Sequence, residues 1–570
     1  MIQTRITERC RYMRRFFGLF ALLCLLATAS AGQANRDGPG HAGIASAHPL
    51  ATKAGFEILG KGGNAFDAAV AVSAALSVVE QYSSGLGGGG FYLLYDASEN
   101  SYVVIDGREK APAAAYRDMY LDASGRPVPR MSRDGPIAAA IPGVPASLVH
   151  LAGKYGTLPL ETLLEPAIRY AREGFPVDKR MHRGLEAKEA LIARWPAARE
   201  VYLPGGVVPE VGTIIRQPDL ARTLEALVTK GRDGFYEGEI AKKLVDGVRD
   251  AGGVWTEQDL RDYSVIEREA LIGEYHGMRV VSVPPPSSGG VALINILNIL
   301  AGFDLDTGDR AEQIHVIVEA MRRAYRDRAE YLGDPDFVDV PVEVFVHPFY
   351  AAGQRAGIRN DRITPSQSLP GVSTSSYGGM DTSHFSIIDA DGNRVAGTQT
   401  VNFWFGSGFM APGTGVLLNN EMDDFSVKPG VPNGYELIGG EANSIRPNKR
   451  PLSSMTPTFL ESDRGVAVLG TPGGSRIISM VLLDALAWHA GATAEEMVSL
   501  PRYHHQYIPD QITVEPAALS VEERSALQEL GHQFRDHNGY GNMQVVTWDY
   551  EDDEVAAASD PRGVGEGDVY

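Results

Sequence analysis

Residues 383–402 contain two runs in which hydrophobic and polar residues alternate. Two alternating runs, Ser383 to Asp389 and Arg394 to Asn402, flank the tetrapeptide Ala390-Asp391-Gly392-Asn393. A period of two is typical of a strand whose faces differ, and Asp-Gly is a favoured turn between antiparallel strands. The pattern therefore predicts a β-hairpin that begins immediately after Thr382.

Two polar residues in the second run, Thr400 and Asn402, are two positions apart. Residues with this spacing share one face of a strand, so both side chains are expected to point toward Thr382. The alternative interpretation is that they form the polar face of an edge strand.

Helical patterns occupy much of the first half of the chain. Helices are predicted over Ala47 to Leu59 and Asn64 to Val79, where Asn64 is a suitable N-cap. The segment from Ala138 to Ile272 has a largely amphipathic pattern that predicts helices, and it contains no recognisable set of catalytic residues. Further helices are predicted over Ala292 to Leu300 and Ile314 to Tyr331. The last of these carries a stripe of arginines and acids that predicts a solvated or subunit-facing side.

A run of glycines, SSGLGGGGF from Ser83 to Phe91, separates a predicted helix from a predicted strand. A glycine-rich loop can bind a nucleotide phosphate, but such loops follow a strand and open a helix. Here the order is reversed, because the strand Phe91 to Tyr95 comes next. The run therefore favours a packed core turn. A second strand, Tyr102 to Ile105, completes a hairpin that ends close to Arg108.

Three segments of the second half are candidates for chemistry. The acidic run NNEMDDFSVKPG, Asn419 to Gly430, has the ordinary interpretation of a solvated turn. The long loop Pro429 to Lys449 lacks a periodic pattern, and such loops are commonly lids. In Gly470 to Ser475, GTPGGS, a glycine turn precedes an apolar helix predicted over Ile477 to Trp488. Backbone N–H groups at such a turn form an anion site, although a simple turn is the alternative.

Composition narrows the classes of partner. The 570 residues are 44% hydrophobic and 22% charged, which is typical of a soluble globular protein. The formal net charge of −20 argues against nucleic acid or an anionic membrane surface as a partner. His504 and His505 are neighbours, so in a strand they would point apart, and no third ligand accompanies them. No metal site is predicted.

Residues 1–31 have the features of a targeting segment. Five arginines precede an apolar run of twelve residues, Phe16 to Ala27, and the small residues Ala29-Ser30-Ala31 form a cleavage site. Twelve apolar residues are too few to span a bilayer, so no membrane anchor is expected. The sequence predicts an exported protein, periplasmic or secreted. The pair Arg14-Arg15 leaves the general and twin-arginine export routes both open.

Both cysteines, Cys10 and Cys24, lie inside this targeting segment. The mature chain is therefore expected to have no disulfide, no thiolate nucleophile and no cysteine-type zinc site.

The sequence from Asp381 onward, DTSHFSI, resembles the processing site of the γ-glutamyltranspeptidases, which are N-terminal-nucleophile hydrolases. The resemblance implies that the precursor cuts itself between Asp381 and Thr382. Residues 32–381 would then be the large subunit and residues 382–570 the small subunit, which form a heterodimer. It also implies an α+β fold, the αββα four-layer sandwich, built jointly from both subunits.

The chemistry explains why a threonine suits this position. A hydroxyl is a weak nucleophile until a base takes its proton, and a newly exposed α-amine, with a pKa of about 8, is such a base. Before cleavage, the Thr382 hydroxyl can attack the carbonyl of Asp381 in an N-to-O acyl shift, and water can then hydrolyse the ester. Cleavage therefore creates the catalyst.

The resemblance also implies roles for other residues. Thr400 would orient the nucleophile, the amides of Gly473 and Gly474 would form the oxyanion hole, and Tyr435 would gate the loop over the pocket. The α-carboxylate of a glutamyl group would be held by Arg108, Ser453 and Ser454. Its α-ammonium would be held by Asn402, Glu421 and Asp424. Opposite charges at the two ends suit a zwitterionic amino acid.

The activity implied is ping-pong transfer of a γ-glutamyl group from glutathione and related compounds to water, amino acids or peptides, without a cofactor. One alternative is an acylase of the same fold that acts on glutaryl-cephalosporin-type amides. A glutaryl group has no α-amine, so Asp424 would face nothing positive, which favours a glutamyl donor. The other alternative is an exported binding protein without turnover.

Overall fold

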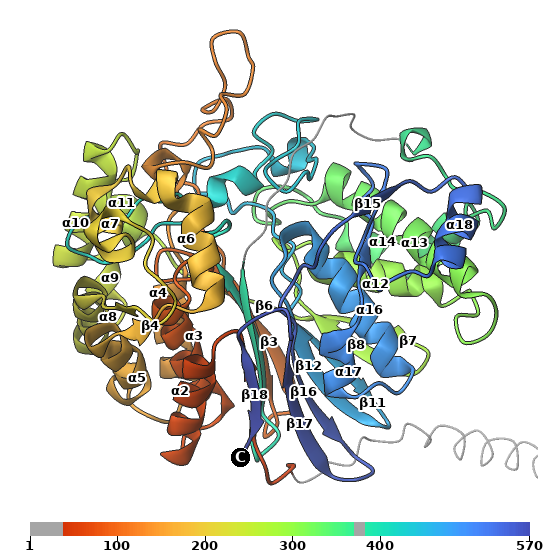
Figure 1. The fold of residues 1–570 in the computed structure, drawn as a ribbon, viewed down its shortest axis with the longest axis horizontal. Helices are drawn as coiled ribbons and strands as arrows, with labels where there is room; N and C mark the ends of the chain where they lie inside the picture. The colour runs from red at the N-terminus through yellow and green to blue at the C-terminus, as the bar shows by residue number, and fades with distance from the viewer. Residues whose placement is uncertain (1–37, 370–381) are drawn as a thin grey trace, which may run out of the picture. The chain divides into compact units, whose positions relative to one another are not determined.

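The computed structural model describes residues 38–369 and 382–570 (Figure 1). The predicted targeting segment and Asp381 lie outside these residues. Pro39 to Tyr570 belong to one compact unit. No helix among the described residues is both long and apolar enough to cross a membrane.

A seven-stranded sheet lies at the centre of the unit and contains the predicted hairpin. Its strands, in spatial order, are β18 (Glu566–Val569), β1 (Gly43–Ser46), β9 (Ser383–Ile388), β10 (Arg394–Thr400), β2 (Gly89–Asp96), β3 (Ser101–Gly107) and β6 (Ile266–Arg268). Neighbouring strands are antiparallel throughout.

A second sheet of six antiparallel strands packs against the first. Its order is β17 (Glu554–Ser559), β16 (Gln544–Asp549), β12 (Gly465–Gly470), β11 (Thr458–Ser462), β8 (Met278–Ser282) and β7 (Leu271–Tyr275). The remaining strands form two small sheets. One contains β13 (Tyr503–His504), β14 (Ile512–Val514) and β15 (Phe534–Asp536), and the other pairs β4 (Phe175–Pro176) with β5 (Ile214–Ile215).

Helices flank the pair of sheets on both sides, as Figure 1 shows. On the side of the first sheet are α2 (Pro49–Gly60), α3 (Ala65–Val79), α4 (Val144–Lys154), α5 (Leu160–Glu173), α6 (Lys179–Ile192), α7 (Pro196–Tyr202), α8 (Pro218–Lys230), α9 (Asp233–Tyr236), α10 (Gly238–Asp250) and α11 (Glu257–Arg261). On the side of the second sheet are α12 (Gly289–Leu300), α13 (Arg310–Tyr331), α14 (Val342–Phe345), α15 (Pro348–Arg355), α16 (Ile477–His489), α17 (Ala494–Ser499) and α18 (Val521–Glu529).

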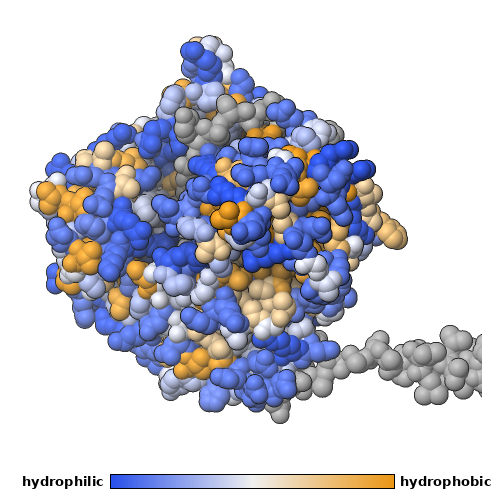
Figure 2. All heavy atoms as spheres, turned by 45° about the vertical axis from the view of Figure 1, so that its right-hand side comes forward, coloured by the Kyte–Doolittle hydropathy of each residue, from blue (hydrophilic) through white to orange (hydrophobic). Residues whose placement is uncertain are grey.

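The side chains of β9 point alternately into two hydrophobic cores, one on each face of the first sheet. Phe385 and Ile387 pack with α2 and α3 in one core, whereas Ile388 belongs to the core between and beyond the two sheets. Every residue of β9 is buried because both faces of the strand are covered. This arrangement confirms the αββα four-layer sandwich. The outer surface is mostly hydrophilic on the face in Figure 2, with hydrophobic atoms in small groups.

The hairpin is confirmed, with one correction. β9 and β10 pair antiparallel from Ser383 opposite Gln399 to Ile388 opposite Arg394. The second strand, however, ends at Thr400, and Asn402 has a φ of 77° in the turn that follows. The strand-alternation argument was therefore wrong for Asn402, because the chain leaves the sheet before that residue.

The predictions for the glycine run and the helix before it agree with the structure. Asn64 caps α3, and its side chain accepts a hydrogen bond from the Asp67 amide in a capping box. A Cβ on Gly87 would clash with the backbone carbonyl of Leu417, and a Cβ on Gly88 with that of Thr400. The glycines therefore form a packed turn, as the helix-to-strand order indicated.

The two segments on either side of residues 370–381 interleave in both sheets. In the first sheet, β9 and β10 lie between β1 and β2, and in the second sheet β11 pairs with β8. Hydrogen bonds between strands thus join the two segments at several places. Neither segment forms either of the two large sheets on its own.

Candidate active site

Two threonines meet where β9 begins and β10 ends. Thr382 precedes β9 and is 4% exposed, and its Oγ1 lies 3.3 Å from Oγ1 of Thr400. Thr400 Oγ1 accepts a hydrogen bond of 2.8 Å from the amide of Asn402. That amide can only donate, so the Thr400 proton points elsewhere, and either hydroxyl of the threonine pair can donate to the other. The pairing of β9 with β10 therefore supplies a positioned hydroxyl pair.

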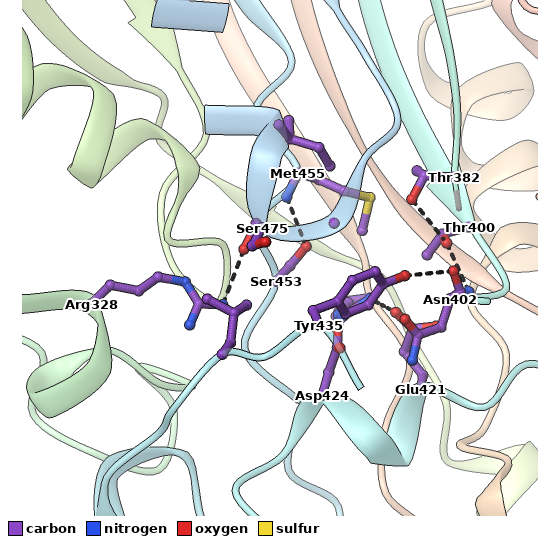
Figure 3. Close-up of a pocket in the computed structure, with 15 residues that line it drawn as sticks. Arg328, Thr382, Thr400, Asn402, Glu421, Asp424, Tyr435, Ser453, Met455 and Ser475 are labelled. Atoms are coloured by element: carbon purple, nitrogen blue, oxygen red, sulfur yellow. Dashed lines mark hydrogen bonds and ion pairs between the residues drawn. The ribbon is translucent and has the colours of Figure 1, made fainter. Parts of the chain in front are cut away.

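The threonines line a cavity with an empty volume of about 310 Å³ (Figure 3). Ten of the residues predicted for the site line it: Arg108, Thr382, Thr400, Asn402, Glu421, Asp424, Tyr435, Ser453, Ser454 and Gly474. They come from both segments of the chain. Gly473 is not in this lining and contributes to a neighbouring pocket.

Arg108 follows the last residue of β3 and is fully buried, which is unusual for an arginine. It donates to a carboxylate oxygen of Glu421 and, over 2.5 Å, to Oδ2 of Asp424. The family resemblance implied that the arginine and these acids lie at opposite ends of a ligand. The structure instead places them in direct contact.

Glu109 joins this cluster at 3.4 Å from Arg108 Nη1, so one guanidinium faces three carboxyl groups. Burial raises the pKa of Glu109 to about 7, and it also raises the pKa of Glu421 and Asp424, although the Arg108 charge opposes the rise. One cation cannot neutralise three carboxylates. The cluster therefore has the capacity to bind a further positive group.

Arg328 is a site residue that the sequence analysis missed. It projects from α13 and lines the cavity on the side opposite Thr382 in Figure 3. Its guanidinium donates to Ser288 Oγ and Ser454 Oγ, each at 3.0 Å. Among the described residues no carboxylate forms an ion pair with it. Burial lowers the pKa of Arg328 to about 10, because the protein around it compensates its charge poorly.

For the charged stripe of α13, the solvated interpretation is wrong, whereas the subunit-facing interpretation agrees with the contacts: Arg322 pairs with Asp510 and Arg328 donates to Ser454, both in the segment 382–570. Arg322, Arg323 and Arg328 are at most 5% exposed. Glu319 accepts from Arg322 Nε at 3.1 Å and from Arg323 Nη1 at 2.7 Å, so these charges are paired inside the protein. The spacing of Glu319 from the two arginines was the available signal. No local pattern marked Arg328.

Tyr435 covers the cavity from the loop between Pro429 and Lys449. Its hydroxyl donates to the Asn402 carbonyl over 2.7 Å, and its ring stacks on Phe403 with centroids 4.6 Å apart. The ring also lies against Gly474, where a Cβ would clash with it and where φ is +57°. Glycine is therefore required at this position.

Gly473 and Gly474 form the turn that leads into α16. Gly473 has a φ of 144°, and a Cβ there would lie 2.6 Å from Met480 Cε. Backbone amides that open a helix carry partial positive charge, which favours an anion. Ser453 also lines the cavity, and its Oγ accepts a hydrogen bond of 3.0 Å from the amide of Met455.

The adjacent histidines bind different partners. His504 contacts Ser479 Oγ at 2.7 Å and Gln506 Oε1 at 2.9 Å, whereas His505 contacts Asp510 Oδ1 at 3.2 Å. Burial lowers the pKa of His504 to about 3 and that of His505 to about 4, so both are neutral at neutral pH. Their role in the described structure is to hold neighbouring segments.

The family model described as Gamma-glutamyltranspeptidase matches residues 51–570. The chain is 40% identical over 526 residues to the "Glutathione hydrolase proenzyme" of Escherichia coli (strain K12), which covers 91% of this chain and 90% of that protein.

Two solved structures are also similar. The cephalosporin acylase from Bacillus halodurans has a TM-score of 0.82 at 28% identity, and covers 95% of this chain and 98% of that chain. The Helicobacter pylori gamma-glutamyltranspeptidase has a TM-score of 0.56 at 38% identity, and covers 57% of this chain and 94% of that chain.

Proposed function

Because the chain belongs to the γ-glutamyltranspeptidase family, we propose that it is a self-processing γ-glutamyltransferase and glutathione hydrolase. The observation that carries the proposal is the position of Thr382. Its hydroxyl lies 3.3 Å from that of Thr400 in a cavity whose wall carries both acids and arginines. A nucleophile next to charges of both signs suits an amino-acid substrate.

Maturation is the first step of the proposal. The Thr382 hydroxyl attacks the carbonyl of Asp381, and water then hydrolyses the resulting ester. Two subunits follow, residues 32–381 and 382–570, which remain joined because their strands share both sheets. We propose that residues 1–31 direct export to the periplasm or the medium and are removed.

Turnover then proceeds in two acyl transfers. The Thr382 α-amine takes the hydroxyl proton, and Oγ1 attacks the γ-carbonyl of the donor. The amides of Gly473 and Gly474 stabilise the oxyanion, and the leaving amine departs with a proton. Water or the amine of an amino acid or peptide attacks the γ-glutamyl ester, which restores the hydroxyl. No cofactor takes part.

The donor is held through its charged head group. Its α-ammonium is proposed to bind Asp424, Glu421 and Asn402, where three carboxyl groups share one guanidinium. Its α-carboxylate is proposed to bind Arg108, Ser453 and Ser454. The present contact of Arg108 with Asp424 means that each must exchange a protein partner for a substrate partner. This exchange keeps both charges compensated throughout.

Arg328 is proposed to assist on the carboxylate side. It donates to Ser454 Oγ, so it orients a hydroxyl already assigned to the carboxylate. A buried cation without a carboxylate partner costs folding free energy, and the substrate's α-carboxylate would supply the missing charge.

Arg328→Met tests this role through two opposite effects. We expect kcat/KM for a γ-glutamyl donor to fall about 100-fold, because a buried charge contact with substrate is lost. The melting temperature should stay the same or rise, since an uncompensated buried charge is replaced by an apolar chain of similar length. Steady-state kinetics and thermal unfolding measure the two. A variant that unfolds at lower temperature but keeps its kcat/KM would make Arg328 a structural residue only.

The acylase alternative has one observation in its favour, the fold similarity to the cephalosporin acylase. The acids of this site argue against it, because a glutaryl group offers them no cation.

The wild-type enzyme should therefore hydrolyse γ-glutamyl-4-nitroanilide at least about 100-fold faster than glutaryl-4-nitroanilide, compared as kcat/KM. The expected ratio reflects one buried charge contact. Initial rates of nitroaniline release measure both. A preference for the glutaryl compound would replace the proposed function by the acylase.

A further inference from the structure

A buried carboxylate next to the nucleophile has no part in the mechanism above. Glu80 is the C-cap residue of α3, its side chain is fully buried, and it does not line the cavity. Its Oε2 accepts a hydrogen bond from the hydroxyl of Ser383, the residue that follows Thr382 and begins β9. A buried acid costs free energy unless it is compensated, so a specific role for this one is expected.

Two further donors compensate the charge of this carboxylate. Nε of Arg180, on α6, lies 3.6 Å from Oε1 of Glu80, and the hydroxyl of Tyr82 donates to the same oxygen over 3.3 Å. An ionised carboxylate can only accept hydrogen bonds, so Ser383 is the donor in the contact with Oε2. That contact is therefore charge-assisted, and such hydrogen bonds are stronger than those between neutral groups.

The backbone of Glu80 is fixed as well. Its N–H donates to the carbonyl of Leu76 at 2.9 Å, and its carbonyl accepts from the amides of Ser83 and Ser84 at 2.8 and 3.0 Å. Residues 80–84 form a turn after α3, which we call the α3 turn, and α3 itself is buried along its whole length. A side chain on a rigid support can hold its partner in a defined position.

The α3 turn also contacts the strand that carries the second threonine. The carbonyl of Ser83 accepts a hydrogen bond of 3.2 Å from the amide of Val401, the residue after Thr400. The turn is thus bonded to the residue that follows each member of the hydroxyl pair, Ser383 on one side and Val401 on the other. The 3.3 Å between the two hydroxyl oxygens therefore depends on this turn.

We propose that Glu80 is a positioning residue for the nucleophile and acts through Ser383. The inference rests on the proposed function. Cleavage leaves Thr382 at the end of a chain, where the covalent restraint from the preceding residue is gone. The contact of Ser383 with Glu80 then keeps the start of β9 in place, so that the α-amine and the hydroxyl of Thr382 stay directed at the donor. A displacement of about 1 Å at a reacting atom can cost a large part of the rate.

The test separates catalysis from binding in Ser383→Ala and Glu80→Gln. The first variant removes the hydroxyl, and the second removes the charge but keeps the shape. We expect kcat for γ-glutamyl-4-nitroanilide, expressed per mature small subunit, to fall about tenfold in each. The inhibition constant of free glutamate, which binds without reacting, should change less than about twofold, because neither residue lines the cavity.

The double variant shows whether the two residues act together. Once one partner of the contact is gone, removal of the other should add little, so the double variant should match the less active single variant. Independent effects would instead multiply to a loss of about 100-fold. Ser383→Thr keeps the hydroxyl and should retain the wild-type kcat. Ser383→Ala and Ser383→Thr test the contact even where Glu80→Gln does not fold.

Ser386→Ala is the matched control. Ser386 is another buried serine of β9, and its hydroxyl donates to the carbonyl of Gln544 at 3.1 Å, away from the α3 turn. The melting temperature should fall in this variant as in Ser383→Ala, because each loses a buried hydrogen bond. Only Ser383→Ala should lose kcat, since only its hydroxyl adjoins the nucleophile.

The outcomes also separate this proposal from the proposed function. An unchanged kcat in Ser383→Ala, or a double variant that loses the product of the two single effects, refutes the role of Glu80. A wild-type chain that is cut but does not hydrolyse the anilide refutes the proposed function. In that case the rate of cutting, which uses the same hydroxyl, decides about Glu80: it should fall about tenfold in Ser383→Ala, and an unchanged rate refutes the role.

Discussion

Thr382→Ala is expected to yield one uncut polypeptide without measurable turnover. The substitution removes the atom that attacks Asp381 and the atom that forms the γ-glutamyl ester, so both reactions lose their nucleophile at once. The loss in kcat should be about 10⁴-fold or more, as for other removed nucleophiles. A denaturing gel shows the cut, intact mass and amino-terminal sequencing locate it, and γ-glutamyl anilide hydrolysis gives the rate.

Thr382→Ser is the matched control, because it keeps a hydroxyl on the same backbone. It should still be cut and retain measurable activity. If Thr382→Ala is cut as in the wild type, or if the small fragment begins at another residue, the nucleophile has been assigned wrongly. A wild-type chain that stays whole would instead support the non-catalytic binding protein.

Asp424→Asn should give the second largest effect, a loss of selectivity for the α-amine. We expect kcat/KM for γ-glutamyl-4-nitroanilide to fall about 100-fold, because a substrate ammonium would lose its buried carboxylate. Hydrolysis of glutaryl-4-nitroanilide, which has no ammonium, should not fall. The ratio of the two kcat/KM values is therefore the quantity to measure.

Asp423→Asn controls for changes in packing. Asp423 is buried beside Asp424, but it binds Ser132 Oγ and the Gly434 amide and does not line the cavity. Any effect it has should be the same for both anilides. Equal losses for both substrates in Asp424→Asn would contradict a direct contact with the α-amine.

The cephalosporin acylase from Bacillus halodurans has a similar fold, which is why these selectivity ratios matter. The two folds agree over nearly their whole lengths, with a TM-score of 0.82. A fold can support several acyl transfers, so the layers alone do not choose between donors. In this chain the choice is proposed to lie in the charges opposite Thr382.

The sequence predicted those elements whose pattern is local. Alternation identified the hairpin of β9 and β10, Asn64 identified the start of α3, and continuous apolar runs identified α12 and α16. Each of these signals depends on residues a few positions apart, where a side chain's direction follows from the backbone period. For the same reason the prediction failed at Asn402, where the period ends without a local sign.

The contacts of the buried charged groups could not be predicted from local sequence patterns. Arg108 and Asp424 are 316 positions apart, and only the pairing of β3 within one sheet and the loops above it bring them into contact. The stripe on α13 looked solvated because hydropathy cannot show that Glu319 compensates two arginines inside the protein. Arg328 remained unidentified because its partners, two serines, come from other segments.

By itself, then, the sequence determined the hairpin and the junction that carries Thr382 and, through family resemblance, the layered fold and most of the residues around the nucleophile. Only the tertiary structure decided that Arg108 contacts the acids directly, that Arg328 faces the same cavity, and that Glu80 contacts the residue after the nucleophile. The physical reason is that the periodicity of a strand or helix depends on residues close together in the sequence. The compensation of a buried charge depends instead on segments that come into contact only after folding.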